Sequence, residues 1–183
     1  IEINYTFKVG FDTVTDIVDA VGGVDVTVEP GYALDDFLCL KNFSVHEGVN
    51  HLNGEQALAY ARERYAYSEG DRHRTKNQQQ VLMGIVDKIT SPAIVTNYAS
   101  IMDSMADTFS TTMSSQEISD LIKYQLNNNP KWKMEQSMVD GTGDTLMCAE
   151  LGNAAYVMVP NEDTVTKASK KIEAVMNGHS STD

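Results

Sequence analysis

The alternation of apolar and polar residues divides the first part of the chain into two predicted strands with a helix between them. Residues 1–9 alternate well enough for a strand, and valines at every second position of residues 24–28 indicate another. Between them, apolar residues are spaced for one face of a helix that ends at the Gly22–Gly23 pair. This strand–helix–strand order favours some parallel pairing. Residues 30–53 follow neither period and are interpreted as irregular.

Helical spacing dominates the remainder of the chain. A short helix is predicted over residues 54–60, and a longer one begins at Asp71, which is also its predicted N-cap. Ser114 with Glu117, and Asn161, are the predicted caps of two later helices. Beyond residue 90 we expect helices over 93–109, 115–126 and from 162 onward, strands over 132–139 and 155–159, and a glycine-rich loop over 140–144. The fold class that follows is α/β of the mixed α+β kind, with a central mixed β-sheet packed between helices.

Length and composition fit one folded domain. The chain has 183 residues, of which 42% are hydrophobic, enough for a core. We expect residues 1–178 to belong to a single domain and residues 179–183 to form a disordered tail. No apolar run reaches the ~18 residues of a membrane span, and no signal-peptide pattern is present. Because the chain begins with Ile1 and passes directly into a strand pattern, we interpret it as part of a longer protein.

All four arginines of the chain lie in one short window between residues 54 and 89, although the chain as a whole has a net charge of −12. They are Arg62, Arg64, Arg72 and Arg74. The guanidinium group matches phosphate oxygens better than any other side chain, so this confinement indicates a site for a doubly charged anion. The alternative is a solvated, charged helix face, which is the common fate of charge runs.

Two features of the spacing favour the anion site. In the helix that begins at Asp71, steps of three and four back from the apolar stripe of its second half reach Gln78, Arg74 and Asp71. Polar groups at the mouth of a core stripe must be paired or face a ligand. In an extended segment, Arg62 and Arg64 point the same way and the glutamate between them turns away. Arg62 and Arg64 can therefore present two guanidinium groups to one cleft.

The segment ALAYARERYAYSEGDRHRTKNQQQVL resembles the signature of the LytR-CpsA-Psr family, the cell-envelope phosphotransferases of Gram-positive bacteria. The family pattern is an arginine, one residue, another arginine, a short loop, then Asp, two residues, Arg, three residues and Gln. The matching positions are Arg62, Arg64, Asp71, Arg74 and Gln78. DAVGGVDVTV and EGVNHLNGEQAL also resemble this family. The resemblance is strong from Tyr5 to about residue 89 and rests beyond that on the order of elements.

The resemblance implies an enzyme that transfers a polyprenyl-pyrophosphate-linked cell-wall glycopolymer, such as teichoic acid or capsule, to peptidoglycan. A phosphodiester forms and polyprenyl phosphate leaves. Arg62, Arg64 and Arg74 would clamp the pyrophosphate, and Gln78 would hydrogen-bond a phosphate oxygen. Asp71 would orient the arginines or assist with a proton, which makes Asp71 and Arg74 the catalytic candidates.

The resemblance also implies a cofactor and a location. A magnesium ion (Mg²⁺) is expected, held mainly by aspartates upstream of Ile1, so no metal ligand is assigned in this chain. For the same reason the chain alone is expected to be inactive. The family acts at the extracellular face of the cytoplasmic membrane, through an N-terminal anchor that this chain does not include.

Two other classes of function stay open. One is a module that binds polyprenyl phosphate or an anionic wall polymer without catalysis. The other is a transcription regulator, an older label of this family. A net charge of −12, with no helix-turn-helix pattern and no basic face, argues against nucleic acid as a partner.

The two cysteines, Cys39 and Cys148, are predicted to form a disulfide. An even number of cysteines in a chain expected to work outside the membrane fits this pairing, and both residues lie in predicted loops. The family does not require such a bond.

Overall fold

The computed structural model describes residues 3–91 and 109–179, and the chain divides into two compact units. We call them the amino-terminal unit, Ile3–Trp132, and the carboxy-terminal unit, which begins at Lys133. The helix predicted over residues 93–109 lies almost entirely outside the described residues, and so does most of the predicted tail. In the described parts of the chain, no helix is long and apolar enough to cross a membrane.

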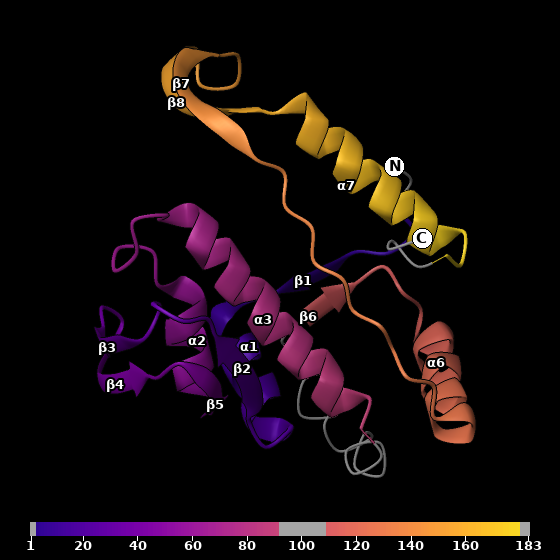
Figure 1. The fold of residues 1–183 in the computed structure, drawn as a ribbon. Helices are drawn as coiled ribbons and strands as arrows, with labels where there is room; N and C mark the ends of the chain where they lie inside the picture. The colour runs from indigo at the N-terminus through magenta and orange to yellow at the C-terminus, as the bar shows by residue number, and fades with distance from the viewer. Residues whose placement is uncertain (1–2, 92–108, 180–183) are drawn as a thin grey trace. The chain divides into compact units, whose positions relative to one another are not determined.

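The amino-terminal unit pairs its strands in a different way from the one that the sequence pattern favours. Its elements in chain order (Figure 1) are β1 (Phe7–Val9), α1 (Phe11–Ala20), β2 (Val24–Val28), β3 (Leu34–Phe37), β4 (Leu40–Val45), β5 (Gly48–Leu52), α2 (Gly54–Arg62), α3 (Asp71–Ile89), β6 (Phe109–Thr111) and α6 (Ser115–Asn128). β1 pairs with β6, β2 with β5 and β3 with β4, each antiparallel. The prediction of parallel pairing between the strands that flank α1 is therefore wrong, because β1 and β2 join different partners.

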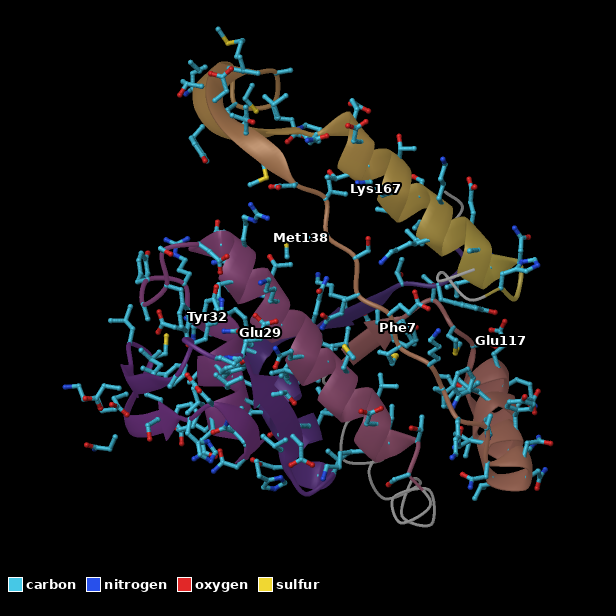
Figure 2. The ribbon with its side chains drawn as sticks, viewed as in Figure 1. Phe7, Glu29, Tyr32, Glu117, Met138 and Lys167 are labelled. Atoms are coloured by element: carbon cyan, nitrogen blue, oxygen red, sulfur yellow. The ribbon has the colours of Figure 1, made fainter. Side chains whose placement is uncertain are left out.

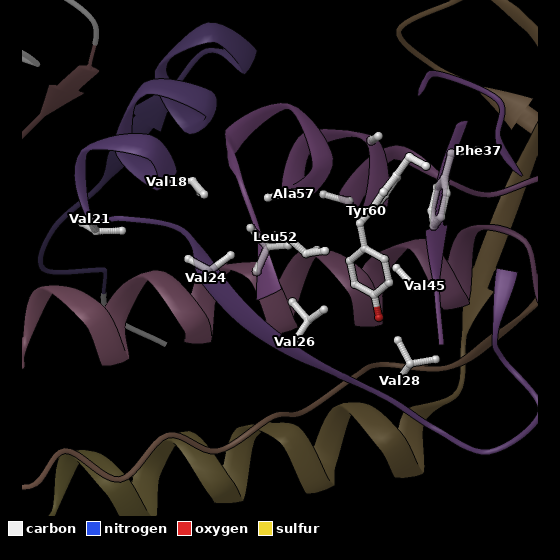
Figure 3. Packing of buried hydrophobic residues seen from close by; sticks show 14 residues of the cluster. Val18, Val21, Val24, Val26, Val28, Phe37, Val45, Leu52, Ala57 and Tyr60 are labelled. Carbon is white, nitrogen blue, oxygen red and sulfur yellow. The ribbon is translucent and has the colours of Figure 1, made fainter. Parts of the chain in front are cut away.

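The core of this unit lies where α1, α2 and α3 pack around the β2–β5 pair. The valines of β2 are buried and the residues between them are exposed, as the alternation predicts. Figure 3 shows Val24, Val26, Leu52 and Tyr60 converging in this core. Within α3, Val81 is buried, whereas Leu82 is 57% exposed although it belongs to the apolar stripe.

Residues 30–53 were predicted to be irregular, but they hold three strands, β3 to β5. Its pattern is broken by backbone irregularities: a shift of register lies between Asp35 and Phe37, and Asp36 and Asn42 adopt positive φ angles of 62° and 59°. A bulge places consecutive residues on the same side of a strand, which removes the period of two. The sequence reading missed the β3–β4 hairpin for this reason.

The carboxy-terminal unit consists of β7 (Gly141–Cys148), β8 (Asn153–Pro160) and α7 (Glu162–Met176). Residues 132–139 form no strand, and the predicted glycine-rich loop is instead the first half of β7. Gly141 and Gly143 face atoms of β8 so closely that a Cβ would collide with them, so these glycines mark close approach within a sheet. Among residues 133–179 no side chain is buried.

The predicted caps of α6 and α7 are confirmed. Ser114 and Glu117 form the capping box that opens α6, because each side chain bonds the backbone N–H of the other. The Asn161 side chain accepts from the backbone N–H of Asp163, at 3.0 Å. Local cap chemistry therefore sets both helix starts, independently of tertiary packing.

Candidate functional site

A pocket of about 530 Å³ opens in the amino-terminal unit between the end of α2, the start of α3 and the β3–β4 hairpin. It is lined by Phe11, Leu38, Cys39, Arg62, Glu63, Arg64, Tyr65, Arg74 and Gln78. All four residues predicted to bind the pyrophosphate therefore line one pocket. We call it the arginine pocket.

Arg62 and Arg64 are delivered by the end of α2. A capping box begins this helix: the Asn53 side chain accepts from the Gln56 N–H, and the Gln56 side chain accepts from the Asn53 N–H, both at 3.0 Å. The helix runs two residues further than predicted, so Arg62 is its last residue. Glu63 then turns the chain into an extended conformation and Arg64 follows. Arg62 and Arg64 both line the pocket. The prediction that they belong to one extended segment is wrong, because Arg62 is helical.

Glu63 was predicted to turn away from the two arginines, but it lines the same pocket and is buried, with 3% of its surface exposed. Its carboxylate accepts hydrogen bonds from the backbone N–H groups of Leu38, Tyr65 and Ala66. Burial by itself would raise the pKa of the Glu63 carboxyl, but these backbone donors outweigh it and hold the pKa below its usual value. Glu63 is therefore an anion inside the protein, beside a pocket lined with cations.

Two aromatic rings support the guanidinium groups of α2 and its following loop. The guanidinium carbon of Arg62 lies 4.8 Å from the ring centre of Phe11, and that of Arg64 lies 4.5 Å from the ring centre of Tyr65. Arg64 Nη2 also donates to the Tyr65 hydroxyl. Cation–π contacts fix the position of each guanidinium group and leave its positive charge unneutralised. Sequence reasoning missed both rings, since neither shows a spacing that links it to the arginines.

Asp71 opens α3 without capping it. The N-cap is Gly70, whose φ of 54° favours glycine, and no side chain caps the helix. The predicted cap role of Asp71 is therefore wrong. Its carboxylate lies 3.2 Å from Arg74 Nη2 and 3.7 Å from Arg64 Nη1. Asp71 does not line the pocket but pairs with an arginine on each side of it, a geometry suited to orienting both.

His73 is a second group that sequence reasoning missed. It is 6% exposed and packs against two tyrosine rings, with ring centres 4.6 Å from Tyr32 and 3.7 Å from Tyr67. Its Nδ1 lies 3.5 Å from Glu69 Oε2, but the geometry is not that of a hydrogen bond. Burial lowers the pKa of His73, although Glu69 acts in the opposite direction. Tyr32 and Glu29 are labelled in Figure 2, close to the start of α3.

The arrangement suits a multiply charged anion. Three guanidinium groups and one amide surround the pocket, and the nearby carboxylates are occupied: Glu63 by backbone N–H groups, and Asp71 by Arg64 and Arg74. Guanidinium groups neutralise phosphate oxygens and donate to them in a fixed geometry. Arg72, the fourth arginine, does not line the pocket. The roles of the individual residues in binding and catalysis stay predictions.

Cys39 and Cys148 are both free thiols in this structure, and their pairing stays a prediction. Cys39 lies at the tip of the β3–β4 hairpin and lines the arginine pocket, whereas Cys148 ends β7 in the carboxy-terminal unit. A disulfide needs the two Cα atoms within about 7 Å, and an even count of cysteines carries no such geometric information.

The described residues do not fit a magnesium site. Within residues 3–91 and 109–179, no group of three or more His, Cys, Asp and Glu side chains is placed to hold a metal ion. Hard cations such as Mg²⁺ need several oxygen ligands around one point. The magnesium ion stays a prediction from the resemblance.

Comparison with known proteins gives matches along most of the chain. The profile of the LytR_cpsA_psr family matches residues 1–174. The polyisoprenyl-teichoic acid–peptidoglycan teichoic acid transferase TagU of Enterococcus faecalis is 33% identical over 144 residues, which cover 78% of this chain and 45% of that protein. The TagU protein of Bacillus cereus is 34% identical over 123 residues, which cover 67% of this chain and 39% of that protein. The chain thus spans less than half the length of these curated relatives.

A solved structure gives the same picture of the fold. The crystal structure of B. subtilis TagV matches with a TM-score of 0.70 at 26% identity, over 94% of this chain and 64% of that one. The mixed α/β fold class predicted from the sequence is confirmed by this likeness and by the elements described above.

Proposed function

This chain belongs to the LytR_cpsA_psr family, and we propose that its arginine pocket binds the pyrophosphate of a polyprenyl-linked wall glycopolymer. In the complete protein the pocket would serve transfer of that polymer to peptidoglycan. The observation that carries the proposal is the convergence of Arg62, Arg64, Arg74 and Gln78 on one pocket. The relatives named above are teichoic acid transferases, and teichoic acid is the polymer that their names favour.

The proposed reaction is a phosphoryl transfer. A hydroxyl oxygen of a peptidoglycan sugar bonds to the phosphorus that carries the polymer, and the bond from that phosphorus to the bridging oxygen breaks. Polyprenyl phosphate leaves with the bonding electrons, and the hydroxyl proton passes to a nearby base or to the leaving phosphate. Such a transfer needs neutralisation of charge on the phosphoryl oxygens and a well-placed nucleophile.

Within this reaction, the three pocket arginines would neutralise the pyrophosphate and Gln78 would fix one oxygen. Asp71 lies 3.2 Å from Arg74 and 3.7 Å from Arg64, which supports an orienting role over proton transfer. A carboxylate held by two guanidinium groups is a weak base, because both stabilise its charged form.

The proposed place of action is the cell envelope of a Gram-positive bacterium, at the outer face of the cytoplasmic membrane. Polyprenyl lipids reside in the membrane and peptidoglycan lies outside it, so the two substrates meet at that face. The partners are therefore the lipid-linked glycopolymer and peptidoglycan, with no nucleic acid.

A transfer assay tests the proposal. A longer form that reaches the length of the curated relatives is incubated with a polyprenyl-pyrophosphate-linked glycan and peptidoglycan, with and without magnesium. We expect wild-type turnover, loss of turnover in Arg74→Ala, and little change in Arg72→Ala. Arg72→Ala is the matched control, because it removes the same charge from the same helix turn but not from the pocket.

The outcomes separate the proposed enzyme from a binding module. Binding of the lipid without turnover in the wild-type long form would favour the module. Full turnover in Arg74→Ala, with its thermal unfolding unchanged, would contradict the proposal, because a clamp arginine cannot be dispensable.

A further inference from the structure

Glu63 is a buried charge that the proposed reaction does not use. It stands between the two arginines at the end of α2, and its side chain is 3% exposed. Burying a carboxylate is costly unless hydrogen bonds replace its hydration. A residue at such a position therefore has a structural or functional reason to be charged.

The two carboxylate oxygens of Glu63 hold two different segments. Oε1 accepts from the backbone N–H of Tyr65 at 2.8 Å and of Ala66 at 3.1 Å. Oε2 accepts from the backbone N–H of Leu38 at 3.2 Å. The first pair fixes the loop that follows α2, and the second bond fixes the tip of the β3–β4 hairpin. Leu38, Arg64 and Tyr65 all line the arginine pocket.

We propose that Glu63 is a positioning residue, which ties the β3–β4 tip to the arginine loop and so sets the width and shape of the pocket for its anion. Binding of the anion rests on the proposed function, whereas the tie itself does not. Glu63 acts through Arg64, Tyr65 and Leu38 and does not need to touch the ligand.

The chemistry of the tie explains why a carboxylate stands here. An ionised glutamate is an acceptor at both oxygens, so it can face N–H groups on both sides. Glutamine keeps one acceptor oxygen, but its NH₂ group would then face an N–H. Glu63→Gln can therefore satisfy either the loop or the hairpin tip, and the two N–H groups of the loop favour the loop.

The substitution also separates positioning from simple electrostatics. Removing a negative charge beside an anion site strengthens anion binding if charge alone matters. Loss of the tie weakens binding, because the guanidinium groups and the Leu38 wall are no longer held in place. The two roles of Glu63 thus predict changes of opposite sign.

The test combines two measurements on the 183-residue chain, for wild type, Glu63→Gln, Glu63→Asp and Glu55→Gln. Amide hydrogen exchange, followed residue by residue by NMR, reports the tie at Leu38, Tyr65 and Ala66. Titration with inorganic pyrophosphate by calorimetry reports the pocket. Glu55→Gln is the matched control, because Glu55 is exposed in the first turn of the same helix and does not line the pocket.

We expect Glu63→Gln to speed amide exchange at Leu38 by about tenfold or more, because this amide loses its hydrogen-bond acceptor. A tenfold change corresponds to ~1.4 kcal/mol in the free energy of opening. Tyr65 and Ala66 keep most of their protection, and pyrophosphate binds several-fold more weakly. Glu63→Asp keeps both oxygens but withdraws them by one methylene, so it gives a smaller loss and replaces Gln if that variant does not fold. Glu55→Gln leaves exchange at these amides unchanged.

Unchanged exchange at Leu38, or equal or tighter pyrophosphate binding in Glu63→Gln, would overturn the inference. If the wild-type chain does not bind pyrophosphate, it is the proposed function that fails. Selective exchange at Leu38 then still decides whether Glu63 ties the two segments.

Discussion

Two of the pocket's arginines come from a loop wall, residues 62–66, whereas Arg74 and Gln78 come from a helix wall, residues 71–81. After Arg62, which ends α2, the loop wall has no helix or strand to fix it, and hydrogen bonds to the Glu63 carboxylate take that role. The helix wall is fixed by backbone hydrogen bonds of α3 and by packing. The two walls of the arginine pocket are thus stabilised differently. A buried charge stabilises the loop wall and an apolar core stabilises the helix wall, so the two walls are weakened under different conditions.

The helix wall joins the core through side chains on its inner face. Val81 is 3% exposed and packs in the core, and Asn77, also buried, donates through Nδ2 to the Tyr60 carbonyl at 3.1 Å. His73 packs against Tyr32 and Tyr67 one turn earlier. The helix wall therefore depends on volume and burial, and the loop wall depends on charge.

The largest expected effect is that of Glu63→Ala on the loop wall. It leaves three backbone N–H groups without their acceptor, and we expect a loss of about 3 kcal/mol in the free energy of unfolding at neutral pH. Because the folded pKa lies below the ordinary value, the contribution of Glu63 is complete above that value and is lost as the pH falls through the folded pKa. Urea unfolding at neutral and acid pH measures the loss of unfolding free energy and its pH dependence. A loss that is equally large in acid would contradict the role of the ionised Glu63 carboxylate.

Val81→Ala tests the helix wall in the same way. Removing two buried methyl groups from the core costs about 2 kcal/mol through lost contacts and a cavity. No charge is removed, so we expect this loss to be equal at neutral and acid pH. The same urea series provides the measurement, and Leu82→Ala is the control, because Leu82 is the exposed neighbour on the same helix. Equal losses at the two positions would show that the helix wall does not rest on the core.

A smaller effect is expected from His73→Phe, which keeps an aromatic ring beside the two tyrosines but cannot take up a proton. His73 has a lowered pKa in the folded state, so as the pH falls its imidazole takes up a proton in the unfolded chain before it does so in the folded chain. The contribution of His73 to the free energy of unfolding is therefore complete above about pH 6.5 and falls as the pH drops toward the folded pKa of His73. We expect the variant to lose less stability than wild type between about pH 7.5 and pH 5.5. Identical pH dependence in chemical unfolding would contradict a neutral, buried His73.

The smallest stability effect is expected from Asp71→Asn, which joins the two walls at the surface. Its side chain is 60% exposed, and exposed ion pairs contribute about 1 kcal/mol or less. The free energy of unfolding should therefore stay almost unchanged, whereas affinity for pyrophosphate changes because Arg64 and Arg74 lose their common partner. Thermal unfolding and calorimetry measure the two quantities. A large loss of stability would instead make Asp71 a structural residue.

The two walls also differ in how far the sequence predicts them. The helix period placed Arg74 and Gln78 on the buried stripe of α3, which is wrong, because that stripe consists of His73, Asn77, Val81 and Gly84 and Gln78 is exposed. Both residues nevertheless line the pocket. Arg62 and Arg64 were placed by their spacing of two, and they too line the pocket. The position of Glu63 was not predictable, because its partner Leu38 lies on a hairpin whose bulge hides the strand pattern.

The same limit applies to the rest of the fold. Caps such as Asn161 and Ser114 act within a few residues and were predicted correctly. Strand partners depend on distant segments, and the parallel pairing was predicted wrongly. His73 lies on a helix, but its tyrosine partners come from segments with no recognisable period.

Calorimetric titration of a short polyprenyl pyrophosphate into this chain, as wild type, Arg74→Ala and Arg72→Ala, tests the anion clamp most directly. We expect wild type and Arg72→Ala to bind alike and Arg74→Ala to bind about tenfold or more weakly, a difference of ~1.4 kcal/mol or more. Equal affinity of the two variants, at unchanged thermal stability, would show that the arginine pocket does not recognise the pyrophosphate.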